Sequence, residues 1–110
     1  MLSSWGYDED FQNLYLQFPE MYESLDKKSF LITGATGLVG TCLTEFLVFL
    51  RLLKGIELQI TALASSEENL SNRFPKFREW DFFTPLAQDI RNKFDSESEF
   101  DYIVHAASVA

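Results

Sequence analysis

The sequence has a single cysteine and few basic residues. Cys42 lies within a helical pattern, so no disulfide can form inside the chain and a reducing compartment is expected. We interpret it as a buried helix-face thiol, because no partner for catalysis or metal binding lies near it in sequence. Lysine and arginine number 9 against 17 aspartates and glutamates, and the net charge of -8 argues against sequence-independent binding of nucleic acid or anionic membranes.

Long apolar runs and targeting segments are also missing. The longest apolar block, Leu43 to Leu53, is interrupted by Glu45 and Arg51, so it is too short and too charged to cross a bilayer. The first residues do not combine a basic stretch with an apolar one, so no signal peptide is predicted and we expect a cytoplasmic protein. A length of 110 residues allows at most one domain, and the chain shows neither an internal repeat nor an interdomain linker.

The most informative feature is a glycine motif of the form G-x-x-G-x-x-G, made by Gly34, Gly37 and Gly40. An apolar run, Ser29–Thr33, precedes it, and a long apolar helix pattern follows it, which is the context that a dinucleotide-binding motif requires. Gly34 would make the tight exit from the strand, Gly37 would let backbone N–H groups approach a diphosphate, and Gly40 would let the helix pack closely. The alternative is a β-turn-α junction that is merely rich in glycine.

Strand and helix patterns alternate after a helical arm over residues 1–28. In the arm, Phe11, Leu14, Tyr15 and Phe18 form one apolar stripe, and Pro19 interrupts it and could begin a second short helix. We expect this arm to dock either on the body of the domain or on a neighbouring subunit.

Beyond the arm we predict four strands and three helices. The strands are Ser29–Thr33, Ile56–Ala64, Lys76–Trp80 and Phe100–His105. The first helix runs from about Leu38 to Leu53, and the second runs from a capping box of Ser65 and Glu68 to about Phe74. The third helix covers two turns that carry Leu86, Ile90 and Phe94. Such alternation predicts an α/β fold with a parallel sheet in the order 3-2-1-4. The fourth strand would keep an open edge, so we expect a homo-oligomer.

The combination of motifs resembles a known family. Three features carry the resemblance: Thr33-Gly34-x-x-Gly37-x-x-Gly40, an aspartate expected at the end of the third strand (Asp81), and His105-Ala106-Ala107-Ser108. Together they are similar to the N-terminal part of extended short-chain dehydrogenases/reductases, in the NAD-dependent epimerase/dehydratase group that acts on nucleotide sugars. The resemblance covers residues 27–110 well and the arm loosely. It implies a partial Rossmann fold, with the arm over 1–28 and a truncated NAD(P)-binding domain over 29–110, and NAD or NADP as cofactor.

The resemblance also implies where the cofactor would bind. The diphosphate would lie on Gly34, Thr36, Gly37, Leu38 and Val39; the adenosine beside Ser65, Ser66, Asp81 and Phe82; and the nicotinamide-side ribose beside His105, Ala106, Ala107 and Ser108. Other interpretations stay open. Asp81 could cap the turn after it, Ala106 and Ala107 could simply be small residues at a tight strand end, and His105 could be a hydrogen-bonded strand-end histidine.

Two departures from the family pattern matter. Members that prefer NAD usually carry an acidic residue at the end of the second strand, where this chain has Ser65 and Ser66, so the choice between NAD and NADP is open. The family's catalytic Tyr-x-x-x-Lys pair is absent, because no tyrosine of the chain has a lysine four positions later. We therefore expect an N-terminal cofactor-binding fragment that is inactive alone and has neither a catalytic residue nor a metal site. The nucleotide sugar would be a partner only of a full-length parent. The alternative is a non-catalytic, self-associating or regulatory Rossmann-like module.

Overall fold

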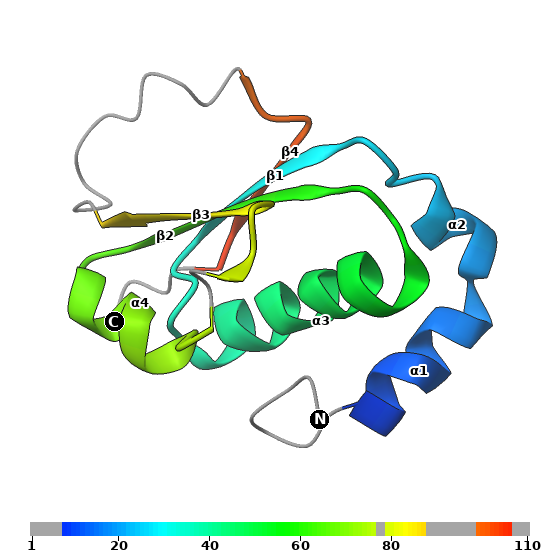
Figure 1. Cartoon of the computed structure of the whole chain (residues 1–110), viewed down its shortest axis with the longest axis horizontal. Helices are drawn as coiled ribbons and strands as arrows, with labels where there is room; N and C mark the ends of the chain where they lie inside the picture. Colours follow the sequence, from blue (N-terminus) through cyan, green and yellow to red (C-terminus); the bar gives the residue numbers. More distant parts are fainter. Residues whose placement is uncertain (1–7, 77–78, 88–98, 107–110) are drawn as a thin grey trace.

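The computed structural model describes residues 8–76, 79–87 and 99–106, which form a four-stranded parallel sheet with helices packed against it (Figure 1). The strands lie in the order β3-β2-β1-β4, which confirms the predicted α/β fold and sheet order. The elements in chain order are α1 (Asp8–Gln17), α2 (Pro19–Glu23), β1 (Ser29–Thr33), α3 (Leu38–Lys54), β2 (Gln59–Ala64), α4 (Glu67–Arg73), β3 (Phe83–Ala87) and β4 (Tyr102–His105).

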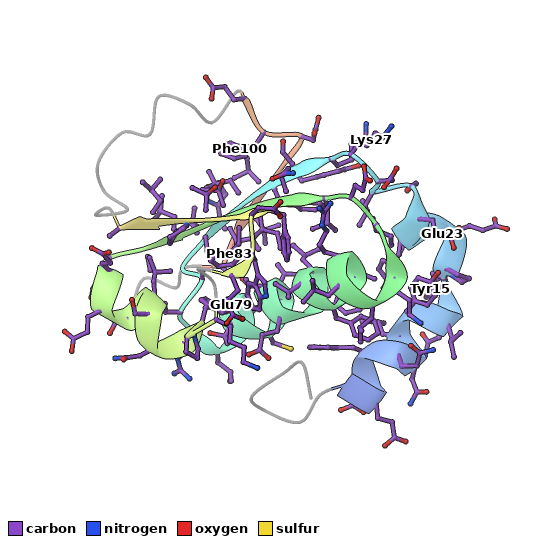
Figure 2. All side chains as sticks on the ribbon, in the orientation of Figure 1. Tyr15, Glu23, Lys27, Glu79, Phe83 and Phe100 are labelled. Atoms are coloured by element: carbon purple, nitrogen blue, oxygen red, sulfur yellow. The ribbon has the colours of Figure 1, made fainter. Side chains whose placement is uncertain are left out.

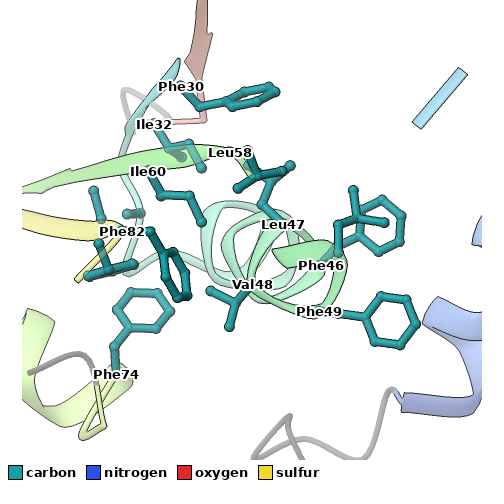
Figure 3. Close-up of a cluster of buried hydrophobic side chains, with 14 of the residues drawn as sticks. Phe30, Ile32, Phe46, Leu47, Val48, Phe49, Leu58, Ile60, Phe74 and Phe82 are labelled. Carbon is teal, nitrogen blue, oxygen red and sulfur yellow. The ribbon is translucent and has the colours of Figure 1, made fainter. Parts of the chain in front are cut away.

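The core lies between one face of the sheet and α3. Phe30 and Ile32 of β1 and Ile60 of β2 point toward Leu47 and Val48 of the helix, and all are buried (Figure 3). These strand residues alternate with residues that face the other side, as the two-residue period of a strand requires. Strand β1 begins and ends where the sequence predicts.

Helix α3 is long because few residues interrupt its apolar pattern before a glycine ends it. Arg51 and Lys54 lie in its last turn, and Gly55 follows with φ at +68°, the left-handed conformation that ends many helices. Its N-terminal residue, Leu38, directly follows the glycine turn, so the beginning of the helix is held at the carboxyl end of β1.

The arm docks on α3 of its own chain. The Phe11 ring lies 5.4 Å from the Phe46 ring and 5.7 Å from the Phe49 ring, centroid to centroid, and Phe11 is only 4% exposed. The Tyr15 hydroxyl donates a hydrogen bond of 2.9 Å to Glu23, so α1 and α2 are tied together (Figure 2). Of the two expected docking sites, the body of the domain is the one that the structure shows.

The third strand differs from its prediction. Residues 75 and 76 form a turn, Trp80 lies outside any strand, and β3 begins only at Phe83. Leu86 is therefore in a strand rather than in a helix, while Ile90 and Phe94 lie outside the described residues. The physical reason is packing: Phe83 contacts the rings of Phe74 and Trp80 and completes the core beside β2.

Two smaller boundaries also shift. Ser66 rather than Ser65 caps α4, because its hydroxyl accepts the Asn69 backbone N–H at 3.2 Å. Strand β2 begins at Gln59, although Ile56 and Leu58 before it are buried, and β4 begins at Tyr102 rather than at residue 100.

Candidate functional site

The glycine turn lies where the sheet order reverses. Strand β1 pairs with β2 on one side and with β4 on the other, so Thr33 stands between Leu63 and His105 at the carboxyl edge of the sheet. In open parallel sheets, ligands bind at such a point because the two neighbouring connections leave in opposite directions. The residues after Thr33 are thus placed at the natural crevice of this fold.

Two of the three glycines are required by the backbone. Gly34 has φ at +66°, which side chains rarely adopt. Gly40 lies directly against the turn, since a Cβ built on it would be 2.1 Å from the Gly34 carbonyl oxygen. Thr41 reinforces this contact, because its hydroxyl donates to the Ala35 carbonyl at 3.0 Å.

Gly37 has no such constraint. Its φ of -73° and ψ of 174° are open to any residue, and a Cβ built there would have its nearest contact at 3.4 Å, an ordinary van der Waals distance. It is the N-cap of α3, a position where serine, threonine, asparagine or aspartate is usually preferred. Among the described residues nothing in the fold explains this glycine, and its open side would let a ligand approach the backbone.

The first turn of α3 faces this space with its backbone. The first N–H groups of a helix have no partner within the helix and carry the positive end of its dipole. Leu38 and Val39, the first two residues of the helix, are 72% and 67% exposed, so their own side chains are not packed over this end. An anionic group is the ligand that such an arrangement favours.

The end of β4 completes the other side of the crevice. The Thr33 hydroxyl lies 3.3 Å from Nδ1 of His105, and the Ala106 backbone N–H donates to the Thr33 carbonyl at 3.0 Å. His105 is exposed and Ala106 partly buried, so the imidazole faces the solvent at the carboxyl edge while the alanine packs on the core. Ala107 and Ser108 lie outside the described residues.

A polar hollow of about 420 Å³ lies on the β2 side of the turn. It is lined by Thr36 of the turn and by Asn69, Asn72 and Arg73 of α4. Ser66, at the start of α4, uses its hydroxyl to cap that helix, while Ser65 is exposed. The three α4 residues were not predicted from the sequence. Asn72 and Arg73 follow Asn69 by three and four positions, which predicts a shared helix face, but not that this face meets the turn.

Asp81 and Phe82 lie at the opposite end of the sheet from the turn, contrary to the placement expected for them. Because β3 begins at Phe83, Asp81 and Phe82 precede the strand rather than follow it, and the Phe82 carbonyl accepts the N–H of Ile60 at the amino end of β2. Phe82 is buried, and the Arg51 guanidinium lies over the Phe82 ring, 5.1 Å from the ring centroid. Phe82 therefore belongs to the core at the amino edge of the sheet, and Asp81 lies beside it in an exposed turn.

Cys42 has the environment of a structural thiol. It lies beside a largely apolar hollow of about 450 Å³ between α1 and α3, whose lining includes Phe11, Leu14 and Val39. Burial, and secondly the negative charge of Glu45, raise the pKa of the Cys42 thiol, which keeps it protonated near neutral pH. Cys42 lies on a helix face as expected, but it is partly buried rather than buried.

Metal-ligand clusters and membrane-spanning helices are both absent from the part of the chain that the structure describes. Within residues 8–76, 79–87 and 99–106, no three histidine, cysteine, aspartate or glutamate side chains are grouped so that they could hold a metal ion. In the same ranges, no helix combines the length and the apolar character that crossing a bilayer would need.

The sheet order, the glycine turn and the flanking helices define a partial Rossmann-like α/β fold. No protein-family model matches the chain, and no curated protein matches it in sequence. Solved structures do resemble it. One is UDP-glucuronic acid 4-epimerase from Bacillus cereus in complex with NAD, with a TM-score of 0.55 and 20% identity over 74% of this chain.

A second similar structure is a putative protein-L-isoaspartate O-methyltransferase from Plasmodium falciparum in complex with S-adenosyl-L-homocysteine. Its TM-score is 0.52, with 17% identity over 86% of this chain. The chain spans 28% of the epimerase and 48% of the methyltransferase. At these identities the likeness shows the fold alone, and both proteins share it while binding different ligands.

Proposed function

We propose that this chain is the N-terminal, cofactor-binding part of an NAD(P)-dependent epimerase or dehydratase that acts on nucleotide sugars. The observation that carries the proposal is Gly37, a glycine that the fold does not need, at the N-cap of a long helix and at the point where the sheet order reverses. The likeness to an NAD-bound epimerase and the motif ending in His105 and Ala106 support it.

The residues present fit a dinucleotide. Gly34 and Gly37 would border the diphosphate, and the backbone N–H groups of Leu38 and Val39 would donate to its oxygens. His105 and Ala106, together with Ala107 and Ser108 that follow them in sequence, would line the nicotinamide side. A bound nicotinamide would supply hydride acceptance and return, and the chain's own contribution is to hold and orient it.

Catalysis would need groups that these 110 residues do not supply. The chain contains no Tyr-x-x-x-Lys pair, so no phenol is placed beside an ammonium group that could lower its pKa for proton transfer. We therefore propose that the chain binds the cofactor without turning over a sugar. The nucleotide sugar would be a partner only of a longer protein in which further segments complete the site, and we propose a cytoplasmic location for it.

Calorimetric titration of NAD and NADP into the chain and into Gly37→Val tests the proposal. Valine adds bulk where the diphosphate would approach the backbone, so we expect binding to be lost while circular dichroism shows unchanged helical content. Leu53→Val, at the exposed far end of the same helix, is the matched control and should bind as the wild type does. Unchanged affinity of Gly37→Val would reject the site.

The same titration separates the ligands of the two similar structures, NAD and S-adenosyl-L-homocysteine. S-adenosyl-L-homocysteine has no diphosphate, so it should bind weakly if the glycine turn recognises one. If it binds more tightly than either dinucleotide, the chain belongs functionally with the methyltransferase-like members of the fold and the proposal is wrong.

The second candidate is a non-catalytic module that associates with itself. Strand β4 pairs with β1 alone among the described strands, which leaves its other edge to recruit a further strand, and Tyr102 on it is 43% exposed. The arm also exposes the apolar residues Leu16, Phe18 and Met21, which could contact a second chain. A homo-oligomer that is indifferent to nucleotides would favour this candidate over the first.

A further inference from the structure

An apolar hollow of about 450 Å³ lies between the arm and the beginning of α3. Leu14 of α1 and Leu38, Val39 and Leu43 of α3 are among its lining residues, and no described lining residue carries a charge. Leu14, Leu38 and Val39 are all exposed, although the burial of aliphatic groups is favourable. Exposed apolar side chains that gather around one hollow mark a place where another apolar group binds.

The two helices that border this apolar hollow run in broadly the same direction. The Phe11 ring packs on Phe46, and one turn later along α1 the Lys54 ammonium lies over the Tyr15 ring, 4.7 Å from its centroid. Because these contacts advance along both helices together, the chain before Phe11 leaves α1 toward the first turns of α3 (Figure 1). The apolar hollow lies on that side, next to the place where the preceding residues join α1.

The segment that joins α1 there is residues 1–7, which lie outside the described part of the chain. Its sequence, MLSSWGY, is mostly apolar and aromatic and has no charged residue, whereas three acidic residues follow it at once. Trp5 precedes Asp8 by three positions, so its backbone can lie up to about 10 Å away, and Phe11 is only about 4.5 Å from Asp8 along the helix axis. Gly6 gives the chain between them the freedom to fold back. The Trp5 indole is thus within reach of the apolar hollow.

The covalent connection favours this segment over a second copy of the chain. A second copy would bring together two molecules that each carry a net charge of -8, and both would lose translational and rotational freedom. A segment joined by a few residues is instead present at an effective concentration in the millimolar range. The occupant that the structure and the sequence support best therefore belongs to the same chain.

We propose that residues 1–7 fold back onto the apolar hollow and that the Trp5 indole fills it, with Leu14 on one side and Val39 on the other. The inference needs no cofactor, so it is independent of the proposed function. It gives the arm a second anchor, because Phe11 holds α1 near the middle of α3 while Trp5 holds the preceding segment at the beginning of that helix.

Tryptophan fluorescence tests the proposal, because the chain has only two tryptophans, Trp5 and Trp80. Subtracting the spectrum of Trp5→Phe from that of the wild type gives the emission of Trp5 without altering Trp80, which packs on Phe82 and Phe83. We expect this emission to lie at shorter wavelength in the folded chain than in urea, and acrylamide to quench it severalfold less. An emission of Trp5 that is the same in both conditions overturns the inference.

A matched pair of variants locates the surface that Trp5 contacts. Leu14→Glu puts a charge at the apolar hollow, whereas Leu16→Glu puts the same charge on an exposed residue of the same helix that does not line it. We expect Leu14→Glu to move the Trp5 emission toward its value in urea and Leu16→Glu to leave it unchanged, while circular dichroism shows a folded chain in both.

Two results of this comparison would overturn the inference. One is an equal response of Trp5 to the two variants, including no response to either. The other is protection of Trp5 that disappears when the wild type is diluted, because a second copy of the chain would then be what covers the indole.

Discussion

Gly40 and Gly34 approach so closely that a Cβ on Gly40 would lie 2.1 Å from the Gly34 carbonyl oxygen. This contact sets the beginning of α3 directly against the end of β1, which brings the first helical turn to the carboxyl edge of the sheet. The same Cβ would also lie 2.9 Å from the Ala35 Cα, so backbone rather than a movable side chain occupies the space. The position of the candidate site thus depends on the close packing of Gly40 against Gly34 and Ala35.

Gly40→Ala should destabilise the fold. The added methyl group would have to push the helix away from the turn, and overpacking of this kind costs about 1–3 kcal/mol. Urea unfolding followed by circular dichroism measures the loss. Gly37→Ala is the comparison, because its Cβ meets nothing closer than 3.4 Å, and it should lose clearly less. Equal losses in the two variants would contradict the close packing at Gly40.

Phe11→Ala should release the arm from α3. The ring is buried between Phe46 and Phe49, and removing a buried phenylalanine costs about 3 kcal/mol. We expect faster hydrogen exchange throughout α1 and easier proteolysis before β1, while the sheet stays protected. Phe18→Ala, where the ring is 54% exposed, is the control and should change little. Unaltered exchange in Phe11→Ala would mean that the arm is held by other contacts.

Asp101 should make the fold sensitive to acid. The Ser29 backbone N–H donates to its carboxylate at 2.8 Å, and this hydrogen bond, together with the Ser29 hydroxyl and the charge of Lys28, lowers the pKa of Asp101. Because the folded pKa is the lower one, the stabilisation is complete above the unfolded value of about 3.9 and is lost as the pH falls through the folded value.

The measurement is urea unfolding of wild type and Asp101→Asn across the acidic range. Asp101→Asn should be less stable than wild type at about pH 6, and the difference should shrink below about pH 4. Asp81→Asn, at an exposed turn residue, serves as the control. A difference that stays constant down to the lowest pH would show that the carboxylate charge is not what links β4 to β1.

Tyr102→Lys should reduce self-association. Tyr102 begins β4 at the edge of the sheet, stacks on Phe30 with ring centroids 5.0 Å apart, and is 43% exposed. A lysine on an edge strand opposes pairing with a second chain. We expect sedimentation velocity at micromolar concentration to show an oligomer for wild type and a smaller species for the variant. Asn13→Lys, at an exposed polar residue of the arm, is the control and should behave as wild type. A wild-type monomer would contradict the expectation.

The sequence alone predicts the part of the fold whose signals are local. Strand β1, the glycine turn and α3 lie where expected, since an unbroken apolar run, three spaced glycines and the stop at Lys54 and Gly55 each act within a few residues. The sheet order followed from the alternation of strands and helices, because right-handed crossovers leave few arrangements. These predictions are confirmed.

Only the tertiary structure decided which residues form β3. The stretches before and after Asp81 are both short and aromatic, and local propensity does not choose between them. Pairing with β2 makes the choice, because Phe83 pairs with Ile60 and fills the core. Pro85 is tolerated because β3 is an edge strand in the described sheet. Asp81 and Phe82 consequently lie at the amino edge, away from the turn.

The hollow beside the turn was likewise decided by packing. Thr36 and Arg73 are far apart in sequence, and nothing local to either residue indicates that they line one cavity. The sequence determined that a glycine turn would lie at the carboxyl edge of a parallel sheet. Which side chains surround that turn depended on how α4 packs against β2 and β3, because long-range contacts, unlike turns and caps, are set by the shape of the whole core.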